Sequence, residues 1–326
     1  MSASEASLDP IRERIRSELR EPVRPAVSWL AGEIAARHGR TVLGVLFYGS
    51  CLRKETDEGV LDFWVVVDDY RLAYAHPVHA WINPIAAPNV FFLEREFEHR
   101  PVRTKYGVIS RSAFERGTSL AAWHPYVWAR FAQPTRLLAC RDDEARHFFE
   151  QAIGQAILTL VGRLVCHLPN RGGLLRFSLP AFWREAFRQT YDSERRPETE
   201  STIRDHYLAD EERYDAVAAA ALHHLTASGH FDAASEHPRS FSITISPGRL
   251  SGMRMRWRAM RAYSRLLGLT RLLKTAFTFG DWVPYVLWKL ERHTGRKIDL
   301  SPRQRRHPLI FAWPIILPLL LRRNLR

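Results

Sequence analysis

The chain has 326 residues, and 48 Lys or Arg against 35 Asp or Glu give it a formal net charge of +13. This length can bury one large core or two modest ones. The positive charge favours an anionic partner but does not separate nucleic acid, nucleotide and acidic lipid surface. Its three cysteines show neither metal-ligand spacing nor even pairing, which excludes a disulfide framework and indicates a reducing compartment.

Two helices are expected before the first strand. Asp9 followed by Pro10 is typical of an N-cap and first helical residue. Apolar residues recur after them at helical spacing, at Ile11, Ile15 and Leu19. A second helix is expected over residues 26–38, ending at Gly39. The acidic residues among the first thirty, and the absence of an apolar run there, predict no targeting peptide.

The next part of the chain predicts a sheet. Strands are expected at residues 41–48, 60–68, 89–95, 104–110 and 134–139. The run from Val90 to Leu93 is apolar on both faces, so we expect its strand to be central. After Cys140 the pattern becomes helical, with helices expected over residues 144–167, 180–192 and 208–228. The polar residues 229–241 predict a loop and a candidate subdomain boundary.

The first chemical motif is Tyr48-Gly49-Ser50, followed by an apolar strand that carries Asp62. A glycine lets the backbone approach a triphosphate, and a serine hydroxyl with neighbouring N–H groups can bind its oxygens. A carboxylate can hold the magnesium that neutralises those phosphates. This order is that of polymerase-β-type nucleotidyltransferases. A β-turn before an ordinary core strand is the alternative, although a carboxylate in an apolar strand is costly without a cation or hydrogen bonds.

A second motif is the hexapeptide from Lys105 to Ser110, followed by Trp123, Arg130 and Pro134. With it, the chain resembles the mitochondrial translocator assembly and maintenance family, which consists of peripheral-membrane CDP-diacylglycerol synthases and has bacterial members. The matching segments are Tyr48-Gly49-Ser50, Leu61-Asp62-Phe63, Val67-Asp68-Asp69, Lys105 to Ser110, Thr190 to Arg196 and Arg271 to Gly280. The resemblance touches most of the chain from residue 43 to 280, and the hexapeptide is its most specific part.

The chain also departs from these patterns. Cys51 stands where the family usually has glycine, and Gln133 replaces a lysine. Trp64 occupies the place where many polymerase-β-type enzymes carry a second carboxylate, so the second metal ligand is not evident. Asp68 lies about 20 Å from Asp62 along an extended strand, so Asp68 and its neighbour are expected to cap a strand end.

The resemblance implies roles for further residues. Glu194 matches an acidic family position and is the second expected metal ligand, with an ordinary surface glutamate as the alternative. Cations on the transferring phosphoryl group stabilise such reactions. Arg53 and Lys54 could reach the β- and γ-phosphates or be solvated loop charges. We therefore predict Asp62, Lys105 and Arg130 as catalytic, Tyr48, Gly49, Ser50, Lys105 and Arg196 as nucleotide-binding, and Asp62 and Glu194 as metal ligands.

Two C-terminal segments suggest a membrane. Residues 249–274 contain eight basic residues and no acid among apolar ones, which is typical of a basic amphipathic helix on an anionic bilayer. RNA binding and packing on the domain are the alternatives. Residues 308–321 are uncharged, shorter than the roughly 20 residues needed to span a bilayer, and flanked by arginines. They are expected either to dip into one leaflet or to pack in the protein core.

These observations predict an α+β fold. A polymerase-β-like nucleotidyltransferase domain at 1–140 precedes a helical domain at 141–300 and a membrane-associating tail at 301–326. The resemblance implies a phosphatidate cytidylyltransferase that makes CDP-diacylglycerol and pyrophosphate from CTP and phosphatidate with Mg²⁺, in phospholipid and cardiolipin synthesis. It would be peripheral on the cytoplasmic face of a bacterial inner membrane, with an anionic membrane surface and no nucleic acid as partner. The alternatives are a polymerase-β-type transferase acting on a nucleic acid or a small polar acceptor, and a membrane-bound adaptor with a decayed site.

Overall fold

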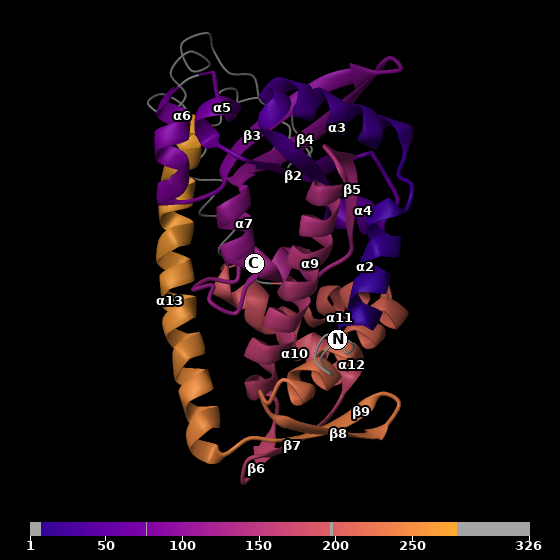
Figure 1. Ribbon diagram of the computed structural model, residues 1–326, viewed down its shortest axis with the longest axis vertical. Coiled ribbons are helices and arrows are strands. Elements are labelled where there is room, and N and C mark those ends of the chain that lie inside the picture. The colour runs from indigo at the N-terminus through magenta and orange to yellow at the C-terminus, as the bar shows by residue number, and fades with distance from the viewer. Residues whose placement is uncertain (1–7, 76, 196–197, 279–326) are drawn as a thin grey trace.

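The computed structural model describes residues 8–75, 77–195 and 198–278. Figure 1 shows a sheet with its covering helices at one end, a bundle of helices in the middle and a small second sheet at the other end. A long helix, α13 (Pro247–Thr278), runs along one side from the second sheet to the first. The molecule is therefore mixed α+β, as predicted.

The first sheet contains the five strands expected from the sequence. They are β1 (Val42–Tyr48), β2 (Val60–Val67), β3 (Asn89–Phe97), β4 (Arg100–Ser110) and β5 (Thr135–Cys140). Their order is β3-β4-β2-β1-β5, with β2 and β4 parallel and the other pairs antiparallel. The parallel pair places the two motif strands side by side at the centre of the sheet.

The prediction that the apolar strand β3 is central was wrong, because β3 lies at the sheet edge. Its apolar character has another cause. Phe91 packs on one face against Tyr74 and Tyr106, with ring centroids 5.8 and 5.4 Å away. Helix α13 packs against the same strand. An edge strand covered by a helix needs apolar residues as a central strand does, and the cover protects its free edge.

Helices cover both faces of this sheet. On one face, α3 (Pro25–His38) buries Val27, Leu30 and Ile34. As predicted it ends at Gly39, whose φ of +65° favours glycine. On the other face, α2 (Asp9–Arg20) and α9 (Asp143–Leu164) form a larger core. The apolar stripe expected on α2 is buried, although its N-cap is Leu8, one residue earlier than predicted.

Short helices fill the connections of the first sheet. They are η1 (Gly39–Thr41), α4 (Ser50–Arg53), α5 (Tyr70–Ala73), α6 (Pro77–Ile82), η2 (Asn83–Ile85), α7 (Arg111–Thr118) and α8 (Trp128–Phe131). The helical region continues with η3 (Val165–His167), α10 (Leu179–Ser193), α11 (Glu200–Leu208) and α12 (Glu211–Ala227). The helices expected at 144–167, 180–192 and 208–228 are thus confirmed within a few residues, whereas α11 was not anticipated.

The loop predicted at residues 229–241 was wrong, because this segment contributes to a second sheet. Its strands are β6 (Asn170–Arg171), β7 (Leu174–Ser178), β8 (Asp232–His237) and β9 (Ser240–Thr244), in the antiparallel order β6-β7-β9-β8. Strand β8 is an edge strand whose side chains are almost all exposed. It therefore lacks the apolar alternation by which strands are recognised.

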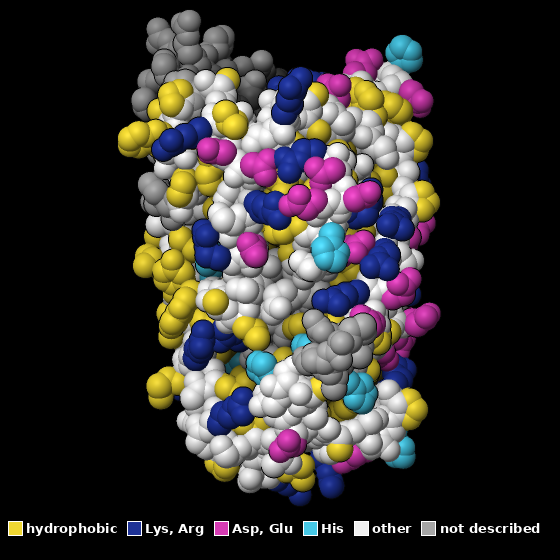
Figure 2. Space-filling view, in the orientation of Figure 1, with side chains coloured by type: hydrophobic (Ala, Val, Ile, Leu, Met, Phe, Trp, Pro, Cys, Tyr) yellow, Lys and Arg dark blue, Asp and Glu magenta, His cyan; other side chains and the backbone are white. Residues whose placement is uncertain are grey.

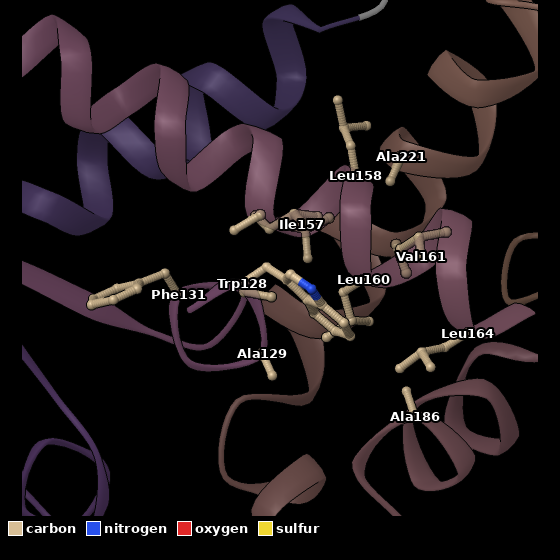
Figure 3. Close-up of a cluster of buried hydrophobic side chains, with 14 of the residues drawn as sticks. Trp128, Ala129, Phe131, Ile157, Leu158, Leu160, Val161, Leu164, Ala186 and Ala221 are labelled. Atoms are coloured by element: carbon tan, nitrogen blue, oxygen red, sulfur yellow. The ribbon is translucent and has the colours of Figure 1, made fainter. Parts of the chain in front are cut away.

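One continuous core joins the first sheet to the helices. It contains Trp64 from β2 and reaches Phe241 in β9 and Trp257 in α13. Figure 3 shows its centre, where the fully buried Trp128 of α8 lies against Ile157 and Leu160 of α9. The helical part of the chain therefore packs directly on the first sheet.

Helix α13 confirms the helix expected over residues 249–274. Every third or fourth residue faces the protein, with buried or half-buried positions at 250, 253, 257, 260, 264, 267 and 271. Within the described residues, no helix combines the length and apolar character needed to cross a membrane. The predicted tail at 301–326, with its apolar segment 308–321, lies outside the described residues.

Candidate functional site

The two motif strands bring Asp62 and Lys105 together. Asp62 of β2 is paired with Tyr48 of β1 on one side and with Lys105 of β4 on the other. Lys105 Nζ lies 2.9 Å from Asp62 Oδ1. The aspartate side chain is 16% exposed and the lysine side chain 44%, so the carboxylate is shielded while the ammonium reaches solvent.

The turn after β1 passes directly over this carboxylate. Gly49 has a φ of +94°, which favours glycine, and a Cβ there would lie 2.8 Å from Asp62 Oδ2. Ser50, the first residue of α4, is exposed. The sequence-predicted residues Tyr48, Gly49, Asp62 and Lys105 are therefore adjacent in the structure, with Ser50 next along the chain.

Trp64 lies two residues after Asp62, at the position where a second carboxylate was expected from the polymerase-β-type pattern. Its buried indole Nε1 donates to the Tyr48 hydroxyl over 3.3 Å. On the neighbouring strand, a Cβ at Gly107 would lie 3.0 Å from Pro88 and 3.6 Å from Trp64 Nε1. The glycine of the hexapeptide thus makes room for Pro88, while the tryptophan would be in ordinary contact with a side chain there. Asp62 is the one carboxylate of β2 at the site.

The hydroxyl of Tyr48 stays protonated at neutral pH. Burial, followed by the charge of Asp62, raises the pKa of Tyr48 to about 12, while Arg130 and Lys105 act in the opposite direction. This tyrosine can donate or accept a hydrogen bond, but it is not a base at pH 7.

Arg130 and Glu194 form a shielded ion pair beside Tyr48. Arg130 Nη1 and Nη2 donate to the two Glu194 oxygens over 2.6 and 2.7 Å, and Nη1 also donates to the Tyr126 carbonyl. Both side chains are 13% exposed. Burial is the largest single effect and lowers the pKa of Arg130, but Glu194, Tyr126 and Tyr48 together outweigh it, so the pKa is well above its usual value. The predicted catalytic arginine holds Glu194 and the Tyr126 carbonyl in this structure, and its catalytic role stays a prediction.

Sequence reasoning missed three residues that surround this pair. The guanidinium carbons of Arg130 and Arg271 lie 3.8 and 3.9 Å from the centroid of the Tyr126 ring. Both guanidinium groups are therefore in contact with the Tyr126 ring. Arg271 is 8% exposed, and its Nε donates to the Ala87 carbonyl over 2.9 Å. Burial and the nearby charges of Arg271 and Arg130 lower the pKa of His124. The available signal was that Arg271 begins the last segment resembling the family.

The metal expectation fits Asp62 better than Glu194. Oδ1 of Asp62 is buried and, apart from its ion pair with Lys105, accepts no hydrogen bond from a described residue. One carboxylate plus substrate phosphates is a common way to hold Mg²⁺. Both oxygens of Glu194 accept hydrogen bonds from Arg130, so a metal there would share the carboxylate with the arginine. No group of three or more His, Cys, Asp or Glu in the described ranges is placed to hold a metal.

The sequence also singled out Arg53, Lys54, Asp69 and Arg196. Arg196 is not among the described residues. Arg53 Nη1 donates to the Gln133 side chain over 3.5 Å, and Lys54 is exposed. Asp69 caps α5 by accepting from the Arg71 N–H, as expected for a residue at the strand end.

Comparisons with known proteins add little to this geometry. Neither protein-family models nor curated protein sequences match the chain. Among solved structures, it is similar to a nucleotidyltransferase-like protein from Exiguobacterium sibiricum 255-15, at 12% identity over 92% of this chain and 91% of that chain, with a TM-score of 0.28. A TM-score this low carries no argument, so the functional assignment rests on the site.

Proposed function

We propose that this chain is a nucleotidyltransferase, and specifically a phosphatidate cytidylyltransferase that joins CTP and phosphatidate into CDP-diacylglycerol and pyrophosphate. The supporting observation is the contact between Gly49, Asp62 and Lys105 at the centre of the sheet. A glycine turn over a strand carboxylate, with a partly exposed lysine beside it, suits a nucleoside triphosphate.

Each of these groups has a role in the proposed reaction. Backbone N–H groups after Gly49 and the Ser50 hydroxyl bind phosphate oxygens. Asp62 would hold Mg²⁺, which would supply positive charge against the triphosphate. Lys105 contributes positive charge to the transferring phosphoryl group. A phosphatidate oxygen is already ionised, so it attacks the α-phosphorus without a strong base, and the bond to the β-phosphate breaks as pyrophosphate leaves.

The outer face of α13 favours a lipid acceptor over a nucleic acid. Figure 2 shows hydrophobic side chains along this edge of the molecule. Large apolar side chains exposed on α13 are Met255 (68%), Leu266 (62%), Leu269 (51%) and Tyr263 (46%). Four arginines of the helix instead donate to protein groups, namely Arg254, Arg261, Arg265 and Arg271. We therefore propose peripheral binding to an anionic membrane surface, on the cytoplasmic face of a bacterial inner membrane.

A catalytically decayed membrane-bound adaptor is the second candidate. The observation that favours it is Trp64, which fills the space of a second carboxylate. Incubating the full chain with labelled CTP, ATP, GTP or UTP, phosphatidate micelles and Mg²⁺, followed by lipid extraction, separates the candidates. We expect label in the lipid phase from CTP alone and only with the metal. Label on tRNA or another aqueous acceptor would reject the lipid assignment, and no transfer would favour the adaptor.

The membrane proposal has its own test. Replacing Met255 and Leu266 together by glutamine should weaken sedimentation with phosphatidylglycerol vesicles at least about tenfold, because each buried apolar side chain is worth about 1.5–3 kcal/mol. Leu208→Gln is the matched control, since Leu208 is 53% exposed on α11. Equal binding by both variants would exclude the α13 face as the docking surface.

A further inference from the structure

We infer that His124, Tyr126 and Arg271 form a subsite for the phosphomonoester group of the acceptor, next to the Asp62–Lys105 pair. This inference rests on the proposed function, because it assigns the place of the second substrate.

The position of the subsite follows from the sheet register. Trp64 is paired with Gly107, two residues farther along the strands than the pair of Asp62 with Lys105. This spacing corresponds to about 7 Å. The Tyr126 ring lies 5.8 Å from the Trp64 ring. On the Gly107 side, Pro88 lies against the glycine, and the carbonyl of the preceding residue accepts from Arg271 Nε. Lys105 and Arg271 thus lie beside adjacent residue pairs of the β2–β4 ladder.

The polar groups of this cluster divide between structure and binding. Arg130 uses both terminal nitrogens on Glu194 and on the Tyr126 carbonyl, so it is committed to holding the cluster together. Arg271 is fixed in position by the Tyr126 ring and by its Nε hydrogen bond. A planar guanidinium held in this way is suited to phosphate oxygens.

His124 supplies an independent observation. Its Nδ1 is buried and has no hydrogen-bond partner within the described part of the chain. A buried nitrogen without a partner is destabilising, and a hydrogen bond to a bound oxygen would remove that cost. Burial, followed by the charge of Arg271, lowers the pKa of His124 to about 4, so the ring is neutral at pH 7 and can donate from one nitrogen. With its proton on Nδ1, His124 would donate to the same oxyanion as Arg271.

The subsite also lies close to the exposed apolar side chains of α13. The His124 ring is 6.4 Å from that of Tyr263, which is 46% exposed on α13. The adjacent Trp123 is 54% exposed and lies 5.4 Å from the Arg256 guanidinium carbon. An acceptor whose apolar chains rest against α13 would meet His124 and Arg271 before the nucleotide. Its phosphate oxygen could then form the new bond to the α-phosphorus as pyrophosphate leaves.

Calorimetry on the full chain with dihexanoyl phosphatidate, in the absence of CTP, tests the subsite without relying on activity. We expect Arg271→Gln to weaken this binding at least tenfold. Arg258→Gln, the same change at an exposed position of α13, should leave it unchanged. In the transfer assay, Arg271→Gln should raise KM for dihexanoyl phosphatidate by a similar factor and leave KM for CTP unaltered.

The other outcomes decide against the subsite or against the function. A rise in KM for CTP alone, or unchanged binding of phosphatidate, would overturn the subsite. Inorganic phosphate that binds as tightly as dihexanoyl phosphatidate would assign the cluster to a free anion and overturn the acceptor role. If thermal melting shows that Arg271→Gln is unfolded, His124→Asn takes its place with the same expectations. Wild-type binding of phosphatidate without any transfer would reject the proposed reaction while supporting the subsite.

Discussion

Lys105 Nζ and Asp62 Oδ1 are 2.9 Å apart, joined across two parallel strands whose residues are in register. The pair lies under the Gly49 turn, where a side chain larger than hydrogen would clash with the carboxylate. A bound cation would compete with the lysine for Asp62, and the lysine side chain is exposed enough to move toward a phosphate. In the proposed reaction, this ion pair is the arrangement before CTP and the cation bind.

The first prediction concerns Asp62. Asp62→Asn keeps the shape of the side chain but removes the charge that the metal and Lys105 use. Turnover should fall at least about 100-fold, as when one electrostatic group at a reacting centre is lost. Stability should change by less than about 1 kcal/mol, because the lysine partner is largely solvated. Label transfer and thermal melting measure both effects, and retention of wild-type turnover would show that the site is elsewhere.

The second prediction separates binding from catalysis at Lys105. A cation that acts on the transition state supports rate more than ground-state affinity. Lys105→Ala should therefore lower kcat more than it raises KM for CTP, which steady-state kinetics can resolve. A rise in KM with kcat intact would make the lysine a plain nucleotide-binding group.

The third prediction concerns Glu194. If it positions Arg130 and does not bind metal, Glu194→Gln should leave the Mg²⁺ concentration for half-maximal activity unchanged. It should also lower the free energy of unfolding by about 1–3 kcal/mol, because Arg130 loses a charged acceptor. Glu200→Gln, at an exposed position of α11, is the control. A tenfold higher Mg²⁺ requirement for Glu194→Gln would restore the metal-ligand role.

Sequence patterns predicted the first sheet well for a physical reason. Strands β1 and β2 are apolar runs bounded by turn residues, and Tyr48 and Gly49 lie at the turn that follows β1. The contact between Asp62 and Lys105 needed the parallel pairing of β2 with β4, which joins residues 43 positions apart. The hexapeptide indicated that Lys105 matters but could not show which carboxylate it faces.

The features that were missed depend on tertiary packing. Strand β8 is exposed and polar, so nothing in its composition separates it from a loop. Arg271 looked like one of many arginines on a basic helix, and only the packing of α13 on the sheet places it against Tyr126. The apolar character of β3 indicated burial correctly, but a covering helix produces that signal as readily as a neighbouring strand.

The fourth prediction tests how α12 is joined to α2 near the N-terminus. Arg213 of α12 donates to Glu18 of α2 through Nε over 2.8 Å and to the Ala132 carbonyl, and Glu18 accepts from the Thr135 N–H. The Arg213 and Glu18 side chains are 3% and 5% exposed. Arg213→Met should cost about 3–5 kcal/mol, because it leaves a buried carboxylate without its cation.

The matched comparison is the double variant Glu18→Leu with Arg213→Met. Since it removes both charges, urea unfolding should find it less destabilised than Arg213→Met alone. Strictly additive losses would show that the two side chains stabilise the fold independently.

The last prediction concerns acid and the attachment of α13. The His167 ring lies 5.6 Å from that of Trp257 on α13, and its Nε2 is buried without a hydrogen-bond partner among the described residues. Burial lowers the pKa of His167 to about 4. Glu185 opposes the shift, whereas Arg254, Arg261 and Arg188 on α13 and α10 add to it.

The sign of the pH effect follows from this shift. In the unfolded chain a histidine has a pKa near 6.5, so between about pH 6.5 and 4 the unfolded state binds a proton that the folded state does not. The contribution of the neutral ring to stability is thus complete above pH 6.5 and is lost as the pH falls toward 4. Urea unfolding at pH 7.5, 5.5 and 4.5 should show a shallower decline for His167→Gln than for the wild type. His147→Gln, at a histidine 63% exposed on α9, is the control. A wild-type slope in His167→Gln would mean that protonation of this ring does not loosen α13, and that the acid sensitivity arises at another group such as His124.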